Sequence, residues 1–469
     1  MANVVYGNIK VVSPFEILYL CQLKIHKCLN QHTRVSFTGV IHPDKKDSYV
    51  NSVSVSDTIQ VSKVDSSEDI LFKGIVSNIE INAVRGIHYL KVEAVSATYN
   101  LDIKFKRRSF QHKDMTYKDL IKEVIKDHSG TDFIDTVSKG KVLEKFIIQY
   151  DETDWEFLKR MASHFNTALV PDSNNDKAKF WFGIPQGSSK GKLEEFHYRV
   201  SKTIGIYRES SENYIGDIEE KDFTYYEIET DKLLCIGDKV QYNNISLVVY
   251  KITSEIISGI LKHLCVLTPE KGLSQNIIRN KKVFKVSVEG KVIETKEDNI
   301  RIHLEIDDKQ KKDEAYWFPY STFFTTEGST GWYCMPEIDD YVKLYFPSNK
   351  EEEAIVINSI RRRINKGDKI DDPDVKYFRT KFKKEKKYNK EELLLSAKDD
   401  KVLIKLHQDK GIEIYSDSEI KIKSDNNMEI DAENIEMKAA DEISMKCKAS
   451  SIKMDGTTHI KGTFVRERC

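Results

Sequence analysis

The chain has 469 residues, which is long enough for about three domains. It carries 74 lysines and arginines against 75 aspartates and glutamates, so its formal net charge of −1 excludes the overall basic charge of a non-specific nucleic-acid or membrane binder. The N-terminus has no basic stretch followed by an apolar core, and no run of about 18 apolar residues occurs, so we expect synthesis in a cytoplasm without a classical signal.

Cysteine and histidine positions give no sign of a cofactor, a metal or a catalytic site. The seven cysteines are scattered, and Cys21 and Cys28 have six residues between them, which is wider than a zinc knuckle. The histidines near the predicted helices (His112, His128 and His164) have no cysteine or carboxylate at a recognisable ligand or triad offset. We therefore predict no catalytic, cofactor-binding or metal-binding residues.

The first predicted region, residues 1–278, contains two similar sets of strands. In each set a turn and a strand are followed by a second strand and a return strand, with similar spacing. We interpret the sets as two related β-barrels at 1–100 and 200–278. The corresponding segments are 57–61, 71–79 and 89–94 in the first barrel and 237–242, 247–256 and 263–267 in the second.

Helices are predicted between the two barrels. Residues 116–128 carry apolar residues on one face, and Thr116 with Asp119 three positions later marks the start of a helix. Thr153 and Glu156 form a capping box before a second amphipathic stretch. Trp155 belongs to the apolar face of this second helix, and we expect it in the core.

Residues 279–364 predict an OB-fold-like barrel. Two alternating segments, 283–293 and 300–306, flank an Asp298-Asn299 turn, and further short strands follow. Aromatic residues at 316–324 and a short basic loop at 309–312 leave open a second hypothesis, a nucleic-acid-binding OB protein with a trimerising β-stalk. We favour core and subunit contacts for these aromatics, so no specific nucleic acid is expected; salt-dependent binding to single strands would support the alternative.

A charged connector is predicted at 365–392. The interval 361–392 holds thirteen lysines and arginines against seven aspartates and glutamates. Two interpretations remain open, a solvated linker and a contact with an acidic neighbour. The segments 393–395 and 402–406 then predict a hairpin that begins the C-terminal region, 393–469.

Between 411 and 463, seven short units of alternating apolar and charged residues follow one another. Their first residues are separated by 8, 8, 7, 8, 9 and 8 positions, so the segment repeats about every eight residues. Alternation with period two predicts a strand in each unit, and the short polar residues between units suit corners. The apolar positions predicted to face inward are Ile412, Ile414, Ile420, Ile422, Met428, Ile430, Ile435, Met437, Ile443, Met445, Ile452, Met454 and Ile460.

One chain cannot bury these repeats by itself. Each strand has two or three inward side chains and two edges with unpaired backbone groups. Eight residues also fall short of the roughly 20–29 residues that one coil of a leucine-rich repeat uses. Three chains wound together would pair every edge and bring the inward side chains, the trimer core of the spike, onto a common axis. His459, next to inward Ile460, would then point outward, away from any axial metal.

The order of these modules resembles the VgrG family and the hub-and-spike proteins of contractile phage tails. The local matches are 109–111, 149–158 and 331–342. The resemblance implies a mainly β fold with an α/β insertion: duplicated hub β-barrels, an OB-fold barrel and a C-terminal trimeric intertwined β-helix (β-prism). It also implies a homotrimer that contacts a hexameric tube protein at the hub, a PAAR-type tip protein at the spike end, baseplate proteins and effector cargo.

The function implied is structural, a spike that caps the inner tube and punctures the target envelope. Such a protein is assembled in the bacterial cytoplasm and delivered outside the cell on contraction, or is part of a phage or tailocin particle. The interval 361–392 and the six residues 464–469 are too short for an enzyme domain, so we expect no enzymatic activity. The other alternative, a β-helix polysaccharide-active enzyme, fits the eight-residue repeat poorly.

Overall fold

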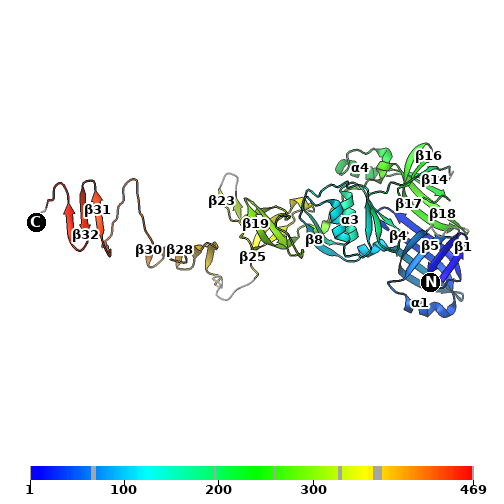
Figure 1. Ribbon diagram of the computed structural model, residues 1–469, viewed down its shortest axis with the longest axis horizontal. Coiled ribbons are helices and arrows are strands. Elements are labelled where there is room, and N and C mark those ends of the chain that lie inside the picture. Colours follow the sequence, from blue (N-terminus) through cyan, green and yellow to red (C-terminus); the bar gives the residue numbers. More distant parts are fainter. Residues whose placement is uncertain are drawn as a thin grey trace. The chain divides into compact units, whose positions relative to one another are not determined.

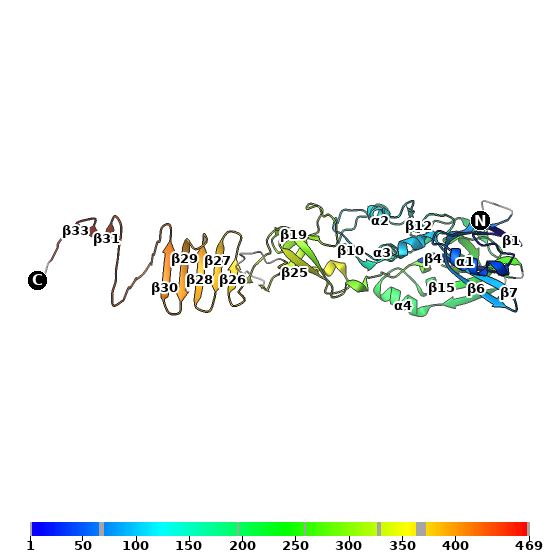
Figure 2. The same cartoon turned by 90° about the horizontal axis from the view of Figure 1, so that it is seen from below.

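The computed structural model describes residues 2–64, 70–194, 197–257, 259–325, 330–362 and 372–466. The chain divides into two units, Met1–Arg362 and Arg363–Cys469 (Figures 1 and 2). Among the described residues, no helix combines the length and the apolar character needed to cross a lipid bilayer. The predicted mainly β fold with an inserted helical region is confirmed.

The first unit is built on a 13-stranded sheet, which we call the hub sheet. Its strands come from two separate stretches of the chain, 2–96 and 189–268. The first stretch contributes β1 (Ala2–Tyr6), β2 (Ile9–Ser13), β3 (Tyr19–Cys28), β4 (Gln31–Ile41), β5 (Thr58–Lys63), β6 (Ile70–Val84) and β7 (Ile87–Ser96). The second contributes β13 (Ser189–Lys192), β14 (Tyr198–Lys202), β15 (Thr224–Thr230), β16 (Lys239–Tyr242), β17 (Ile245–Ile257) and β18 (Ile260–Thr268).

The two stretches form halves with the same strand order. In one half β5, β6, β7, β4 and β3 are neighbours in that order, and in the other β16, β17, β18, β15 and β14 are. The predicted duplication is therefore visible in the topology. The predicted barrels are nevertheless not separate, because Lys24–Cys28 of β3 pair with Lys251–Glu255 of β17 and join the halves. This pairing is possible because β17 extends well beyond β16 and leaves part of its edge free.

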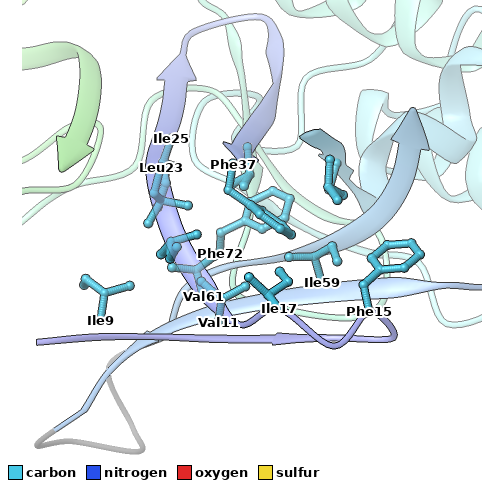
Figure 3. Close-up of a cluster of buried hydrophobic side chains, with 14 of the residues drawn as sticks. Ile9, Val11, Phe15, Ile17, Leu23, Ile25, Phe37, Ile59, Val61 and Phe72 are labelled. Carbon is cyan, nitrogen blue, oxygen red and sulfur yellow. The ribbon is translucent and has the colours of Figure 1, made fainter. Parts of the chain in front are cut away.

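Each half encloses its own apolar core. Strand alternation in β2 and β5 directs Ile9, Val11, Ile59 and Val61 inward, and all four are fully buried (Figure 3). They pack with residues of β3, β4 and β6 in one cluster. A second cluster, around Leu247, Val249 and other residues of the second half, fills the space beneath β15–β18.

The insertion between the halves contains the two predicted helices. α2 (Tyr117–Ile125) is capped by Thr116, and α3 (Asp154–Ser163) begins with the capping box of Thr153 and Glu156. Trp155 is 1 % exposed and packs in the core of the insertion, as predicted. The strands of the insertion are β8 (Lys106–Phe110), β9 (Asp132–Asp135), β10 (Ile147–Glu152), β11 (Leu169–Asp172) and β12 (Lys179–Phe182); two further helices, α1 (Lys46–Ser52) and α4 (Ile204–Asn213), lie in the hub halves.

A closed five-stranded barrel follows, in the order β19-β20-β21-β25-β24. Phe318 is buried in its core, whereas Phe323 and Phe324 are exposed. The predicted aromatic group is therefore divided between the core and the surface. The strands are β19 (Ser287–Lys296), β20 (Asn299–Leu304), β21 (Phe318–Ser321), β24 (Tyr341–Tyr345) and β25 (Ile355–Ile360), with a small hairpin of β22 (Phe324–Thr325) and β23 (Gly331–Trp332) beside them.

The second unit contains two antiparallel sheets. A five-stranded sheet runs β26 (Lys376–Arg379), β27 (Lys384–Tyr388), β28 (Glu392–Ala397), β29 (Val402–His407) and β30 (Gly411–Ser416), each strand beside the next (Figure 2). The three-stranded sheet consists of β31 (Ile443–Cys447), β32 (Ser450–Met454) and β33 (Thr458–Lys461). Residues 417–442 lie between the two sheets, and this described segment contains no strand in the single chain.

The predicted connector 365–392 requires a correction. Two strands, β26 and β27, lie within it, while residues 365–371 lie outside the described part of the chain. Sequence periodicity missed these strands because they are rich in lysine and arginine rather than apolar residues. Ion pairs stabilise them instead: Arg379 pairs with Glu385, and Lys387 Nζ lies 3.1 Å from Glu392 Oε1.

Candidate assembly surface in the C-terminal unit

The five-stranded sheet of the C-terminal unit has one apolar face. The strand registers place Leu395 of β28 beside Ile404 of β29, and Ile404 beside Ile414 of β30. Leu406 and Ile412 form a parallel row on the same face, because alternate residues of a strand share a face. All five side chains are exposed, by 42 to 71 %. We call this surface the apolar face.

The opposite face of this sheet is charged and internally paired. Lys405 Nζ lies 3.0 Å from Glu413 Oε2, and Glu385 is buried next to Arg379. Leu394 and Leu403, which lie on this side, are only 5 % and 8 % exposed. The sheet is thus complete on its charged face and open on its apolar face. A groove of about 510 Å³ runs along the apolar side, lined by residues that include Phe378, Leu395 and Ile404.

The octad repeats continue this exposure along the chain. In the three-stranded sheet, Met445 lies beside Ile452, and Ile452 beside Ile460, in a single row across β31, β32 and β33. Twelve of the thirteen predicted trimer-core positions are exposed in the single chain and the thirteenth, Ile443, is half-buried, so the chain by itself does not bury the predicted core. The exposed positions are Ile412, Ile414, Ile420, Ile422, Met428, Ile430, Ile435, Met437, Met445, Ile452, Met454 and Ile460.

Four of the seven predicted octad strands are present. β30 to β33 contain the units at 412, 443, 452 and 460, whereas the units at 420, 428 and 435 have no strand partner among the residues that the structure describes. The backbone N–H and C=O groups of these three units need partners, as in any extended segment. His459 lies beside Ile460, and its Nε2 is 2.7 Å from Thr457 Oγ1 and 3.5 Å from Asp455 Oδ1.

Part of the apolar face was not predicted from the sequence. Leu395, Ile404 and Leu406 were assigned to a hairpin, but not to the surface that continues into the repeats. The alternation in 402–406 was a usable signal, since it places Ile404 and Leu406 in phase with Ile412 and Ile414 through the register of β29 and β30.

A second functional feature is the junction between the helical insertion and the five-stranded barrel. Arg160 of α3 is 2 % exposed and bridges two buried carboxylates. Its Nη2 lies 2.8 Å from Glu152 Oε2, and its Nη1 lies 3.0 Å from Glu351 Oε1 in the barrel. Burial opposes the charge on the guanidinium, but Glu351 and Glu152 outweigh it and raise the pKa of Arg160.

The polar contacts at this junction extend to β8 and the residue that follows it. The backbone N–H of Ser109 donates to Asp307 Oδ1 at 2.6 Å, and Gln111 Nε2 donates to the carbonyl of Ile302 at 3.1 Å. Burial raises the pKa of Asp307, while the two hydrogen bonds from Ser109 lower it in part. Segments 109–111 and 149–158, chosen from the sequence for their resemblance, thus hold the insertion against the barrel; no sequence signal pointed to Arg160.

Two family models match the chain at these regions. Residues 52–165 match the phage tail baseplate hub (GPD), which covers β5 to α3. Residues 288–360 match the type VI secretion system/phage-baseplate injector OB domain, which covers the closed barrel. The chain therefore contains one stretch that matches a phage baseplate hub and one barrel that matches an injector OB domain. The predicted OB fold is confirmed, and the predicted resemblance to hub and injector proteins is confirmed at these two regions.

Solved structures of hub-and-spike proteins show the same fold. The E. coli protein c3393, described as a component of the type VI secretion system with structural similarity to the T4 bacteriophage tail proteins gp27 and gp5, matches with a TM-score of 0.54 at 12 % identity, over 75 % of this chain and 99 % of that one. The half-lidded PdpA-VgrG complex from Francisella matches with a TM-score of 0.55 at 10 % identity, over 87 % of each chain. No curated protein matches the sequence. These likenesses show that the chain shares the fold of these proteins.

Proposed function

We propose that three copies of this chain assemble through the octad repeats into a rigid spike. The observation that carries the proposal is the row of exposed apolar side chains that recurs from Leu395 to Ile460, in which only Ile443 of the predicted trimer-core positions is half-buried. Burying one such side chain stabilises an assembly by about 1.5–3 kcal/mol, and this gain is repeated at every octad. The domain limits that follow are 1–278 for the hub, 279–364 for the OB domain and 393–469 for the spike.

Three chains solve both problems of the repeats. The apolar side chains of three strands meet on one axis, and each strand edge pairs with a strand of a neighbouring chain. The units at 420, 428 and 435, which lack strand partners in the described part of the chain, gain them from the other two copies. Stacking at about 4.8 Å per strand gives a rod whose outer surface carries the lysines and glutamates of each octad.

The work of this assembly is mechanical. A contracting sheath supplies force, the hub seats on a hexameric tube protein, and the spike transmits the force to the target envelope. A PAAR-type protein closes the spike end, and baseplate proteins and effector cargo are the other partners. The particle is assembled in the bacterial cytoplasm and delivered outside on contraction, and no catalytic step is needed. The buried Arg160 bridge supports this role, because it fixes the hub insertion to the OB barrel.

The mass of the purified full chain tests the proposal. Light scattering should give three times the mass of one chain. Replacing two axial residues, Ile422→Glu and Ile430→Glu, places six carboxylates in the core and should reduce the protein to monomers. The matched control exchanges the outward neighbours, Lys421→Glu and Glu429→Lys, and should leave the trimer intact. A monomeric wild-type chain, or a trimer that persists with both axial glutamates, would contradict the proposal.

A further inference from the structure

Each half of the duplicated hub sheet has a strand edge of the same kind, and within the described part of the chain only one of these two edges is paired. β17 pairs with β16 through Lys239–Tyr242 and Ile245–Val248, and the next part of the same edge, Lys251–Glu255, pairs with β3. β3 thus fills the edge that the shorter β16 leaves free. This contact joins the two halves of one chain.

The first half has the same free edge but no strand on it. β6 pairs with β5 from Ile70 to Ile75, and Val76 donates one further hydrogen bond to the carbonyl of Asp57. Beyond Val76, within the described residues, β6 pairs with β7 alone. The backbone groups of 78–82 on the β5 side therefore face no strand of their own chain.

The second half has a matching free strand. β14 is the last strand of the hub sheet and, among the described residues, pairs with β15 alone. All five of its residues are exposed, including Tyr198 at 54 % and Val200 at 46 %. An exposed edge strand with apolar side chains is a template for pairing with another chain.

The duplication aligns these two edges residue by residue. Both long hairpins carry a bulge at the same distance from the turn: it precedes Asn78 in β6, which ends at Val84, and Lys251 in β17, which ends at Ile257. Residues 78–82 of β6 therefore correspond to Lys251–Glu255 of β17, the part that β3 covers. In the first half, the equivalent residues 78–82 have no strand of the described chain beside them on this edge.

The strands that cover these edges also correspond. Leu23 of β3 lies beside Phe37, which lies beside Val92 of β7. In the second half, Tyr198 of β14 lies beside Ile228, which lies beside Cys265 of β18. β7 and β18 begin at equivalent points of their hairpins, with Ile87 and Ile260, so Val92 matches Cys265 and Leu23 matches Tyr198. β14 is therefore the counterpart of β3.

We propose that β14 of one copy pairs antiparallel with 78–82 of β6 in the next copy, in the register that β3 and β17 use within the chain. In that register Ser254 lies beside Ile25, and Glu255 beside Lys24. Ile81 consequently lies beside Val200 of the next copy, Asn82 beside Arg199, and Glu80 beside Ser201. The inference rests on the proposed assembly of three chains and names the strands through which their hubs join.

The side chains fit this register. Ile81 lies on the face of β6 that packs against the first core, so Val200 beside it joins that apolar face, and Tyr198 lies next along the same face of β14 beside Ala83. Lys202 lies beside Ile79 at the end of the pairing. On the other face, Ser201 can donate to the Glu80 carboxylate and Arg199 to the Asn82 amide oxygen. Within the chain, Lys24 and Glu255 form an ion pair at the position equivalent to Arg199 and Asn82. A slip of one residue would place Val200 against Glu80 and Arg199 against Ile81.

The contact is of the head-to-tail kind, because β6 of each copy accepts β14 of the next. Such contacts generate either rings or open filaments, according to whether the rotation closes. Each chain contributes two equivalent halves, so three chains would alternate three β3–β17 contacts with three β14–β6 contacts around a ring of six. The three-fold symmetry of the proposed spike would close this ring.

Cysteine cross-linking of the full chain tests the pairing. Glu80→Cys with Ser201→Cys places two cysteines side by side in neighbouring copies, on the exposed face of the sheet. The matched control, Glu80→Cys with Arg199→Cys, keeps the same face but lies two residues out of register. The reference pair, His26→Cys with Thr253→Cys, occupies the equivalent position within one chain. The wild-type chain, which has seven cysteines, gives the background.

After mild oxidation, the 80/201 variant should give dimers and trimers on a denaturing, non-reducing gel. We expect roughly tenfold more product than from the 80/199 control, because cysteines whose Cα atoms are more than about 7 Å apart bridge only if the backbone moves. The reference pair should cross-link without a change in mass. Mixing the two single variants, Glu80→Cys and Ser201→Cys, should give dimers and no trimers.

The outcomes separate this inference from the proposed function. A protein that has the mass of a trimer but gives no 80/201 product above background overturns the strand pairing and leaves the spike standing. More product from 80/199 than from 80/201 overturns the register. A monomeric chain without the 80/201 product overturns both proposals. Far-ultraviolet circular dichroism of each variant shows that the hub sheet is still folded.

Discussion

The two units of this protein use the same strand alternation in opposite ways. In the hub, alternating residues of β2 and β5 face a core that the same chain completes, so Ile9 and Val61 are fully buried. In the C-terminal unit, the alternation produces an apolar face that the chain leaves open, with Ile412 and Ile422 exposed by 71 % and 72 %. The comparison teaches that a strand pattern specifies a buried face but not the molecule that buries it.

The largest expected difference concerns how stability depends on protein concentration. Ile422→Ala removes three side chains from one layer of the proposed trimer, about 2–5 kcal/mol per chain, and the midpoint of spike unfolding should shift with concentration. Leu120→Ala, in the fully buried core of the insertion, should cost a similar amount per chain. Its effect should not depend on concentration, since one chain completes that core. Thermal unfolding over a range of concentrations separates the two.

A second prediction concerns the buried bridge between the insertion and the OB barrel. Arg160→Met leaves Glu152 and Glu351 buried without their cation, so the first unit should lose about 3–5 kcal/mol. Adding Glu351→Gln should restore part of the loss, because one buried charge is removed. The exposed control, Arg107→Ala, loses an ion pair with Asp151 and should cost less than about 1 kcal/mol. Denaturant unfolding followed by tryptophan fluorescence measures all three.

A third prediction concerns how the stability of the hub depends on pH. Burial lowers the pKa of His263, in β18 of the hub, to about 4, and its Nδ1 lies 2.7 Å from Ser254 Oγ. Because the unfolded chain takes up this proton near pH 6.5, the hub should lose about 1–3 kcal/mol as the pH falls from 6.5 to 4, and the stabilisation should be complete above 6.5. His263→Gln should reduce this slope. An unchanged slope in the variant would show that other groups cause the pH dependence.

The smallest effect is expected on the outer surface of the repeats. Lys453 pairs with Asp455 at 2.9 Å and with Glu442 at 3.1 Å, but all three side chains are partly exposed, so water screens both pairs. Lys453→Ala should therefore leave the melting temperature of the spike unchanged within measurement, whereas Ile452→Ala, its inward neighbour, should lower it. A drop with Lys453→Ala as large as that with Ile452→Ala would contradict the assignment of inward and outward faces.

Much of the fold was predictable because it depends on local periodicity. Alternation with period two indicated β6, β17 and the octad strands, and the capping box of Thr153 and Glu156 located α3. The similarity of two distant segments predicted the duplication. β26 and β27 were missed because ion pairs, rather than apolar alternation, hold them in the sheet.

Part of the candidate surface was also predictable, because it depends on the same local periodicity. The trimer-core positions follow from the octad period alone, and their burial by two sister chains stays a prediction. Leu395 was missed as part of this surface, because only the register of β28 against β29 aligns it with Ile404.

The sequence by itself determined which residues alternate, where the chain repeats and where it duplicates, since these properties depend on neighbours a few positions away. Only the tertiary structure decided that β3 crosses to β17, that Arg160 joins Glu152 to Glu351, and that one edge of β14 and part of one edge of β6 have no partner strand among the described residues. Each of these features depends on residues far apart in the chain, and a local sequence pattern does not specify which distant strand or charged side chain a residue will contact.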